Sequence, residues 1–116
     1  MHAVIGDAGR TATYAGWVPA KLVLVCGVFG NVSDPDVRKT IKALPTLCED
    51  GATVIWTRHR RDPDLTPTIR AWFDAAGFQE RTFDSPGLDR YAVGVHQLVE
   101  PPQPYDPDLA LFTFTR

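Results

Sequence analysis

The apolar run at residues 22–26, Leu-Val-Leu-Val-Cys, constrains the fold more than any other stretch of the chain. Polar residues do not alternate with the apolar ones, so the run predicts a strand buried on both faces, as in a parallel sheet with helices on each side. Gly27, Gly30 and Asn31 follow directly, and glycine lets a backbone turn and approach another group closely. Because ligands of such sheets bind beyond the carboxyl ends of the strands, residues 27–31 are the first candidate for a binding site.

A helix is predicted directly after this strand. Ser33 can cap its amino end, and Val37 and Ile41 begin an apolar face with helical spacing. Pro45 should break the helix in its last turn, because proline lacks the amide hydrogen that a helix needs. We expect Gly51 to end it with a left-handed residue.

The same strand-and-helix alternation then repeats. Residues 52–57 are β-branched and apolar and predict a strand, and Thr66 caps a second helix that ends at Gly77. Two further strands are predicted at residues 78–83 and 91–99. The turn between them is too short for a parallel crossover, so they should pair antiparallel.

This order predicts an α/β fold with a mostly parallel sheet that is flanked by helices and ends in an antiparallel hairpin. The 116 residues suit a single domain, 1–116. Residues 100–116 form a proline-rich tail with an apolar terminal segment, expected to be extended and to dock or pair at its end.

Composition excludes several functional classes. The net charge of −2 and the pI near 5.8 argue against a nucleic-acid or membrane partner. No apolar stretch reaches the ~20 residues that cross a bilayer, and no signal-peptide pattern is found, so a cytoplasmic location is expected. Cys26 and Cys48 both follow apolar residues and are expected to be packed free thiols.

Taken in order, residues 3–99 resemble the carboxyl-terminal part of a class I S-adenosylmethionine-dependent methyltransferase, a Rossmann-like family whose sheet ends in the same strand-helix-strand-helix-hairpin sequence. Gly6-Asp7-Ala8 resembles the turn after the third strand of that family. The resemblance implies that Asp7 faces the adenine amino group and that the backbone of Ala8 faces the adenine ring. It also implies that residues 22–29 are the fourth strand, whose end at Cys26, Gly27 and Val28 lies beside the methionine part of the cofactor.

The departure from the family concerns its amino-terminal half. The first strand of the family carries a glycine-rich loop, the second ends in an acidic residue for the ribose, and the cofactor cleft lies between strands one and four. Only five residues precede Gly6, so the resemblance supplies about half of a cofactor site and an incomplete methyltransferase fold. The domain is expected to transfer a methyl group to an unknown small-molecule acceptor and to be inactive without the missing half.

The basic stretch Arg58-His59-Arg60-Arg61 is the second candidate site. A solvated loop is the simpler interpretation, because consecutive residues cannot share one face and Asp62 offsets the charge. His59 at a strand end is nonetheless a candidate general base, since its pKa lies near working pH. His96 lies mid-strand and is expected to be structural. The spacing of histidine, cysteine and acidic residues indicates no metal site.

Three hypotheses therefore remain open. The chain is a methyltransferase-like domain completed by an amino-terminal half from upstream or from another chain. Alternatively, it is a non-catalytic truncated α/β domain that self-associates, because the apolar strand at residues 22–29 would form an unpaired edge. The third, a small phosphate or RNA binder using the basic stretch, agrees poorly with the net charge of −2.

Overall fold

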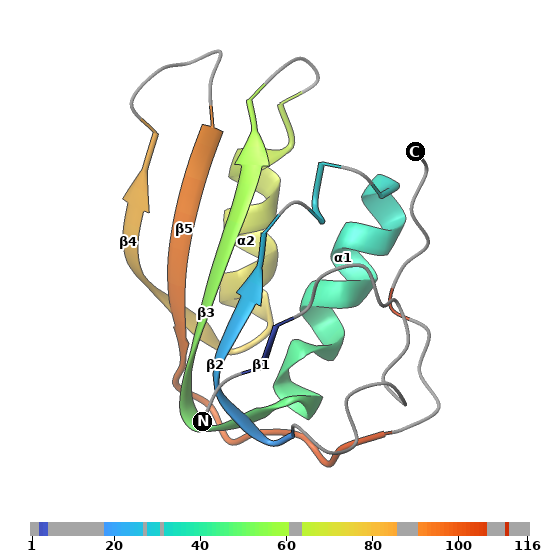
Figure 1. The fold of residues 1–116 in the computed structure, drawn as a ribbon, viewed down its shortest axis with the longest axis vertical. Helices are drawn as coiled ribbons and strands as arrows, with labels where there is room; N and C mark the ends of the chain where they lie inside the picture. Colours follow the sequence, from blue (N-terminus) through green and yellow to red (C-terminus); the bar gives the residue numbers. More distant parts are fainter. Residues whose placement is uncertain are drawn as a thin grey trace.

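The computed structural model describes residues 3–4, 18–26, 28–30, 32–60, 64–85, 91–106 and 111. In chain order the elements are β1 (Ala3–Val4), β2 (Ala20–Val25), α1 (Asp34–Ala43), the 3₁₀ helix η2 (Leu44–Thr46), β3 (Cys48–His59), α2 (Thr66–Ala75), β4 (Phe78–Asp84) and β5 (Tyr91–Leu98) (Figure 1). The predicted order of strands and helices is confirmed for the described residues, and the fold is mixed α/β.

The five strands form one sheet in the order β1-β2-β3-β5-β4. β1 pairs with β2, and β2 with β3, in parallel, whereas β5 is antiparallel to both β3 and β4. The expected antiparallel hairpin of β4 and β5 is confirmed. The expectation of a mostly parallel sheet is wrong. β5 lies between β3 and β4 and is antiparallel to both, so half of the strand pairings are antiparallel.

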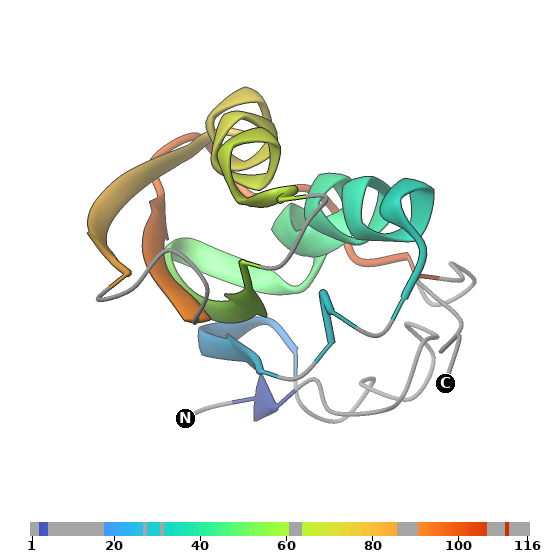
Figure 2. The ribbon, with the colours of Figure 1, turned by 90° about the horizontal axis from the view of Figure 1, so that it is seen from above.

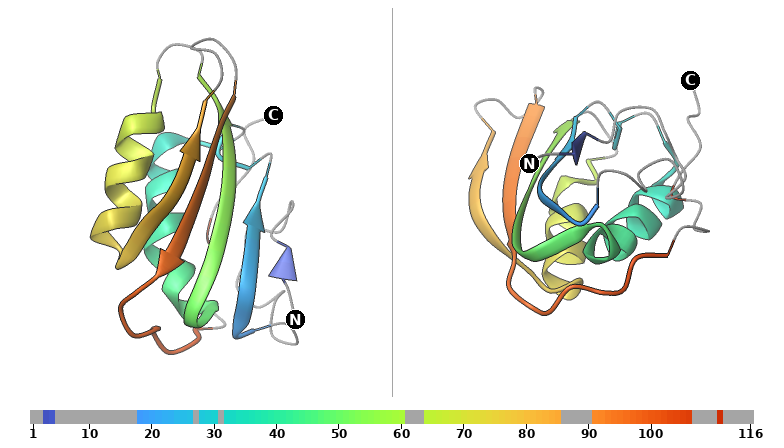
Figure 3. Two further views of the ribbon diagram at one scale, coloured as in Figure 1. Left: turned by 90° about the vertical axis from the view of Figure 1, so that its left-hand side faces the viewer. Right: turned by 60° about the horizontal axis from the view of Figure 1, so that its bottom comes forward.

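Both helices lie on the same face of the sheet (Figures 2 and 3). The crossover through α1 moves the chain from β2 to β3, and the crossover through α2 moves it onward past β5 to β4. Right-handed crossovers that progress in one direction place their helices on one face. The expectation of helices on each side of the sheet is therefore wrong for the part of the chain described here.

The two faces of the sheet differ accordingly in burial. On β2, Val23 and Val25 are fully buried under the helices, whereas Leu22 and Leu24 alternate with them and are only partly buried. The prediction that this strand is buried on both faces is therefore wrong. Pairing places Leu24, Ile55 and Val95 side by side on the opposite face, which no described helix covers. We call this the open face; its apolar side chains are Leu22, Leu24, Ile55, Val93 and Val95.

Aromatic rings fill the space between the sheet and the helices. Trp56 of β3 stacks on Phe73 of α2 with ring centroids 5.9 Å apart, and Phe73 stacks on His96 of β5 at 4.4 Å. All three side chains are buried. Gly94 makes room for the indole, since a Cβ at that residue would lie 2.3 Å from Trp56 Cε2. Rings that overlap in this way fix the distance between the layers.

The first helix begins as predicted and ends earlier than predicted. Ser33 Oγ accepts a hydrogen bond from the Asp36 backbone N–H at 3.3 Å, which confirms the cap. α1 ends at Ala43, and Pro45 lies in the following 3₁₀ turn, so the predicted break is confirmed. Gly51 has the expected positive φ of 75°, but it lies within β3 and not at a helix end, where the pairing with β2 is irregular.

The second helix starts one residue earlier than predicted. Thr66 is its first residue and Leu65 occupies the cap position, so the expectation that Thr66 is the cap is wrong. Asp64 takes over this role, since its Oδ1 accepts a hydrogen bond from the Thr66 backbone N–H at 3.1 Å. Gly77 follows the helix with a φ of 94°, as predicted.

The tail returns along the helical layer. Residues 101–106 contain no helix or strand, and the Gln103 backbone N–H donates to the Pro45 carbonyl at 3.0 Å. Leu111 is fully buried, and the Thr40 hydroxyl of α1 donates to its carbonyl at 3.0 Å. The predicted docking of the terminal apolar segment is thus confirmed at Leu111.

Candidate functional site

The carboxyl ends of the parallel strands β2 and β3 meet at one edge of the sheet, the edge where α/β proteins bind ligands (Figure 1). Of the residues that sequence predicts for a cofactor, Cys26 is exposed directly after β2, and Val28 is fully buried. Asp7, Ala8 and Gly27 lie outside the described residues. A ligand at this edge can therefore contact the Cys26 side chain, whereas Val28 is fully buried and offers it no surface.

The two cysteines differ from the expectation that both are packed. Cys48, the first residue of β3, is buried, and its burial raises the pKa of the thiol to about 12. Cys26 is exposed, which corrects the prediction for that residue. Both are free thiols. Cys26 is thus the accessible one, and it lies at the candidate site.

His59 ends β3 and lies against the loop that follows β2. A Cβ placed on Gly30 would lie 2.9 Å from His59 Cδ2, so the imidazole lies directly against the glycine backbone. The structure therefore brings together two residues singled out separately in the sequence. The close approach explains why a glycine is needed at this position. His59 is partly buried here and remains a candidate general base.

Arg58 is a core residue and not part of a solvated loop, which corrects the simpler interpretation of the basic stretch. It lies inside β3, is 7% exposed, and donates from Nη1 to the Phe29 carbonyl at 2.7 Å. Burial lowers its pKa, while the charges of Asp34 and Asp64 raise it. Arg58 thereby fixes the loop after β2 to β3. The signal for this was in the sequence, because Arg58 continues the every-second-residue alternation of Val54 and Trp56.

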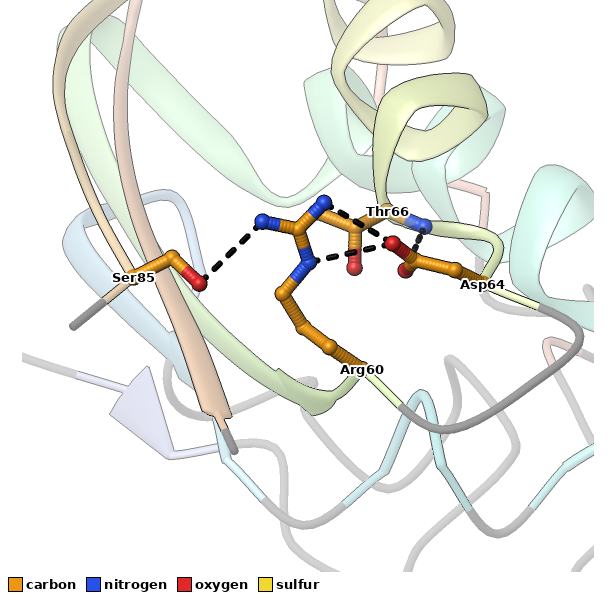
Figure 4. Close-up of polar contacts among 4 residues, drawn as sticks. All are labelled: Arg60, Asp64, Thr66 and Ser85. Carbon is orange, nitrogen blue, oxygen red and sulfur yellow. Dashed lines mark hydrogen bonds and ion pairs between the residues drawn. The ribbon is translucent and has the colours of Figure 1, made fainter. Parts of the chain in front are cut away.

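Arg60 holds together three segments at the same edge (Figure 4). Its guanidinium donates to Asp64 Oδ2 at 2.8 and 3.1 Å and to the Ser85 hydroxyl at 3.2 Å. Hydrogen bonds from Arg60 and from the Thr66 backbone outweigh partial burial and lower the pKa of Asp64. The end of β3, the start of α2 and the end of β4 are thereby connected. No pattern in the sequence predicted this role for Arg60.

His96 is structural, as predicted. Its Nδ1 accepts a hydrogen bond from Trp56 Nε1 at 3.1 Å, so the neutral ring carries its proton on Nε2. Nε2 lies 3.6 Å from Glu80 Oε1, beyond hydrogen-bond distance. Burial lowers the pKa of His96 to about 4, so the ring is neutral near pH 7 and forms no ion pair there.

Two further features are absent from the described part of the chain. No group of three or more histidine, cysteine or acidic side chains there could hold a metal ion. No described helix is long and apolar enough to cross a membrane. The candidate site consists of the exposed Cys26 thiol, the His59 imidazole and the backbone of Gly30.

Comparisons with known proteins identify the fold and no family. No protein-family model and no curated protein matches the sequence. Among solved structures, a mutant of the 16S rRNA (adenine(1408)-N(1))-methyltransferase from Catenulisporales acidiphilia matches with a TM-score of 0.53 and 15% identity, covering 72% of this chain and 52% of that one. The antibiotic-resistance methyltransferase Kmr matches with a TM-score of 0.45 and 16% identity, covering 68% and 50%.

The first of these matches shows that the chain has a methyltransferase-like fold. The chain spans about half the length of each of the two structures. One detail differs from the resemblance. β1 pairs directly with β2, at Ala3↔Val23 and Val4↔Leu24. This is the place of the first strand of the family, the neighbour of its fourth, although the resemblance had assigned the turn after residues 3–5 to the third strand.

Proposed function

We propose that this chain is a methyltransferase-like domain that forms one wall of an S-adenosylmethionine site and transfers the methyl group to an unknown acceptor once the other wall is supplied. The wall is the loop after β2. Cys26 and Gly27 contact the methionine part of the cofactor. Val28 is fully buried and supports the loop from the core, and the adenine contacts of Asp7 and Ala8 are not carried over, because β1 takes the place of the first strand of the family and not of the third. The observation that carries the proposal is the exposed end of β2 at Cys26, in a fold that matches a methyltransferase.

The described residues fit one side of the cofactor. Arg58 and His59 hold the loop after β2 in place, through the hydrogen bond to the Phe29 carbonyl and the contact with Gly30. A fixed loop binds a ligand at lower entropic cost than a mobile one. When bound, the cofactor would supply an activated methyl group. The residues of the chain would orient it, because methyl transfer depends mainly on placing the acceptor in line.

If the chain supplies only one wall of the site, its affinity for S-adenosylmethionine should be low. Measuring this affinity tests the proposal. We expect calorimetry to detect no micromolar binding of S-adenosylmethionine to the 116-residue chain. Amide NMR signals of residues 26–30 should nonetheless shift at millimolar cofactor. Adenosine, which lacks the methionine part, should leave the signals of residues 26–28 in place.

Two variants at opposite ends of β2 sharpen this measurement. Cys26→Trp should abolish the shifts by filling the site, whereas Lys21→Trp, also exposed, should leave them unchanged. Micromolar binding would contradict the proposal of an incomplete site. Shifts that avoid residues 26–30 would contradict the location of the site.

A second function, association without catalysis, is favoured by a different observation. The prediction that residues 22–29 form an unpaired edge is wrong at Val23 and Leu24, because these two residues pair with β1. The open face offers apolar surface instead. We propose that, if the domain is not catalytic, it self-associates through this face. Light scattering should then show a dimer that Ile55→Lys converts to a monomer; a monomeric wild-type chain would contradict it.

A further inference from the structure

A basic groove runs along the outer surface of the helical layer. It is a cavity of about 500 Å³ lined by Asp34, Pro35, Arg38, Lys39, Lys42 and Trp72. A smaller cavity of about 160 Å³ continues it and shares Arg38, Lys42 and Trp72. We refer to the surface formed by Arg38, Lys39, Lys42 and Trp72 as the basic groove. Its volume is in the range of small-molecule sites.

Helical spacing places the three cations on one side of α1. Arg38 and Lys42 are one turn apart, and Lys39 lies beside them, whereas Val37 and Ile41 point to the core and are buried. Trp72 reaches the groove from α2 and is partly buried against the core. The indole is therefore held in place and presents part of its surface beside the three positive charges.

The charges of the groove are not neutralised by ion pairs among the described residues, unlike those of Arg60 and Arg70. Arg60 pairs with Asp64, Arg70 pairs with Glu80, and Arg58 is bound to a backbone carbonyl. Among the described residues, no ion pair involves Arg38, Lys39 or Lys42, and Asp34 is the one carboxylate among the described lining residues. Unpaired cations around a fixed aromatic ring attract an anion that also has a flat face.

We propose that the basic groove binds single-stranded nucleic acid, with phosphates at Arg38, Lys39 and Lys42 and one base stacked on Trp72. Aromatic platforms beside a cationic track are how proteins bind single strands without sequence preference. An acidic peptide would use the charges but leave the indole uncovered. The net charge of −2 for the whole chain had argued against such a partner, but a local field depends on where the charges lie.

Fluorescence anisotropy of a labelled twelve-nucleotide oligo-uridine at 50 mM salt tests this without any cofactor, so its failure is separate from that of the proposed function. Three phosphate contacts predict a slope of about −2 for log K against log salt. Lys42→Gln should weaken binding severalfold and reduce this slope by about 0.7. Lys21→Gln, an exposed lysine of β2, should change neither.

Variants of Trp72 distinguish nucleic acid from other anionic ligands, because only a base can stack on the indole. Trp72→Leu keeps an apolar side chain and should weaken oligo-uridine binding about tenfold with an unchanged salt slope, whereas Trp72→Phe should restore most of it. Circular dichroism confirms that each variant is folded. Oligo-thymidine should bind similarly, and a free nucleotide more weakly. No binding at 100 μM protein would overturn the proposal. Insensitivity to Trp72→Leu, together with equal competition by oligo-glutamate, would overturn it in favour of an acidic peptide.

Discussion

The covered face and the open face of the sheet are built from the same strands and have different roles. On the covered face, Trp56 and His96 are buried in ring contacts with Phe73. On the open face, Ile55 and Val95 lie side by side and remain partly exposed. The two faces differ in burial because the crossovers through α1 and α2 progress in the same direction across the sheet and place both helices on one face. The two described helices therefore cover one face only.

The largest expected effect compares neighbouring residues of β3 on opposite faces. Trp56→Ala should lower the free energy of unfolding by about 3–5 kcal/mol, because it leaves a cavity among packed rings. Ile55→Ala should cost only about 1–2 kcal/mol, since its side chain is already partly in water. Urea denaturation followed by circular dichroism measures both. Equal losses would show that the open face is covered in solution.

An intermediate effect concerns His96, a buried titratable ring on the covered face. Its pKa is about 4 in the folded chain against an ordinary value of 6.5, mainly because of burial. Protonation therefore favours the unfolded state. The contribution is complete above about pH 6.5 and is lost as the pH falls toward 4, on the order of 3 kcal/mol in all.

Denaturation between pH 7 and pH 4 checks this, with two variants. His96→Gln keeps an acceptor for the Trp56 N–H and should remove most of the loss. Glu80→Gln should move the loss to lower pH, because the charge of Glu80 raises the pKa of His96. A wild-type stability that is flat over this range would show that water reaches the covered face.

The smallest effect lies at the exposed rim of the covered face. Arg70 of α2 makes a two-pronged pair with Glu80 of β4 at 2.7 and 2.8 Å, and its guanidinium lies 3.9 Å from the centroid of the Phe83 ring. Both side chains are partly exposed, so a double-mutant cycle with Arg70→Gln and Glu80→Gln should give a coupling of about 0.2–1 kcal/mol. A coupling free energy above 3 kcal/mol would mean that water screens this ion pair no more than it would a pair in the core.

Local signals predicted most of the fold. Pro45 marked the end of α1, Gly77 marked the turn that follows α2, and the short turn predicted the antiparallel pairing of β4 and β5. The predictions that failed depended on the other layers. Residues 22–26 are apolar throughout, and no local pattern shows that helices cover only one side of them. The position of β5 between β3 and β4 likewise depends on pairing that local propensity does not encode.

The candidate site was predictable in part. Gly30 was found because it follows a dense apolar run, and Cys26 because the family resemblance places the end of that run beside the cofactor. Arg58 was assigned to a loop because charge was given more weight than alternation, although Val54, Trp56 and Arg58 point the same way. The ion pair of Arg60 with Asp64 needs a turn geometry that spacing alone does not fix.

Gly94 links two positions that are far apart in the sequence. Because a Cβ there would overlap the Trp56 indole, residue 94 can be enlarged only if residue 56 becomes smaller. The two positions therefore form a single unit of evolutionary variation. Homologous chains should carry glycine with tryptophan, or a larger residue with a smaller one, and either substitution by itself should be selected against.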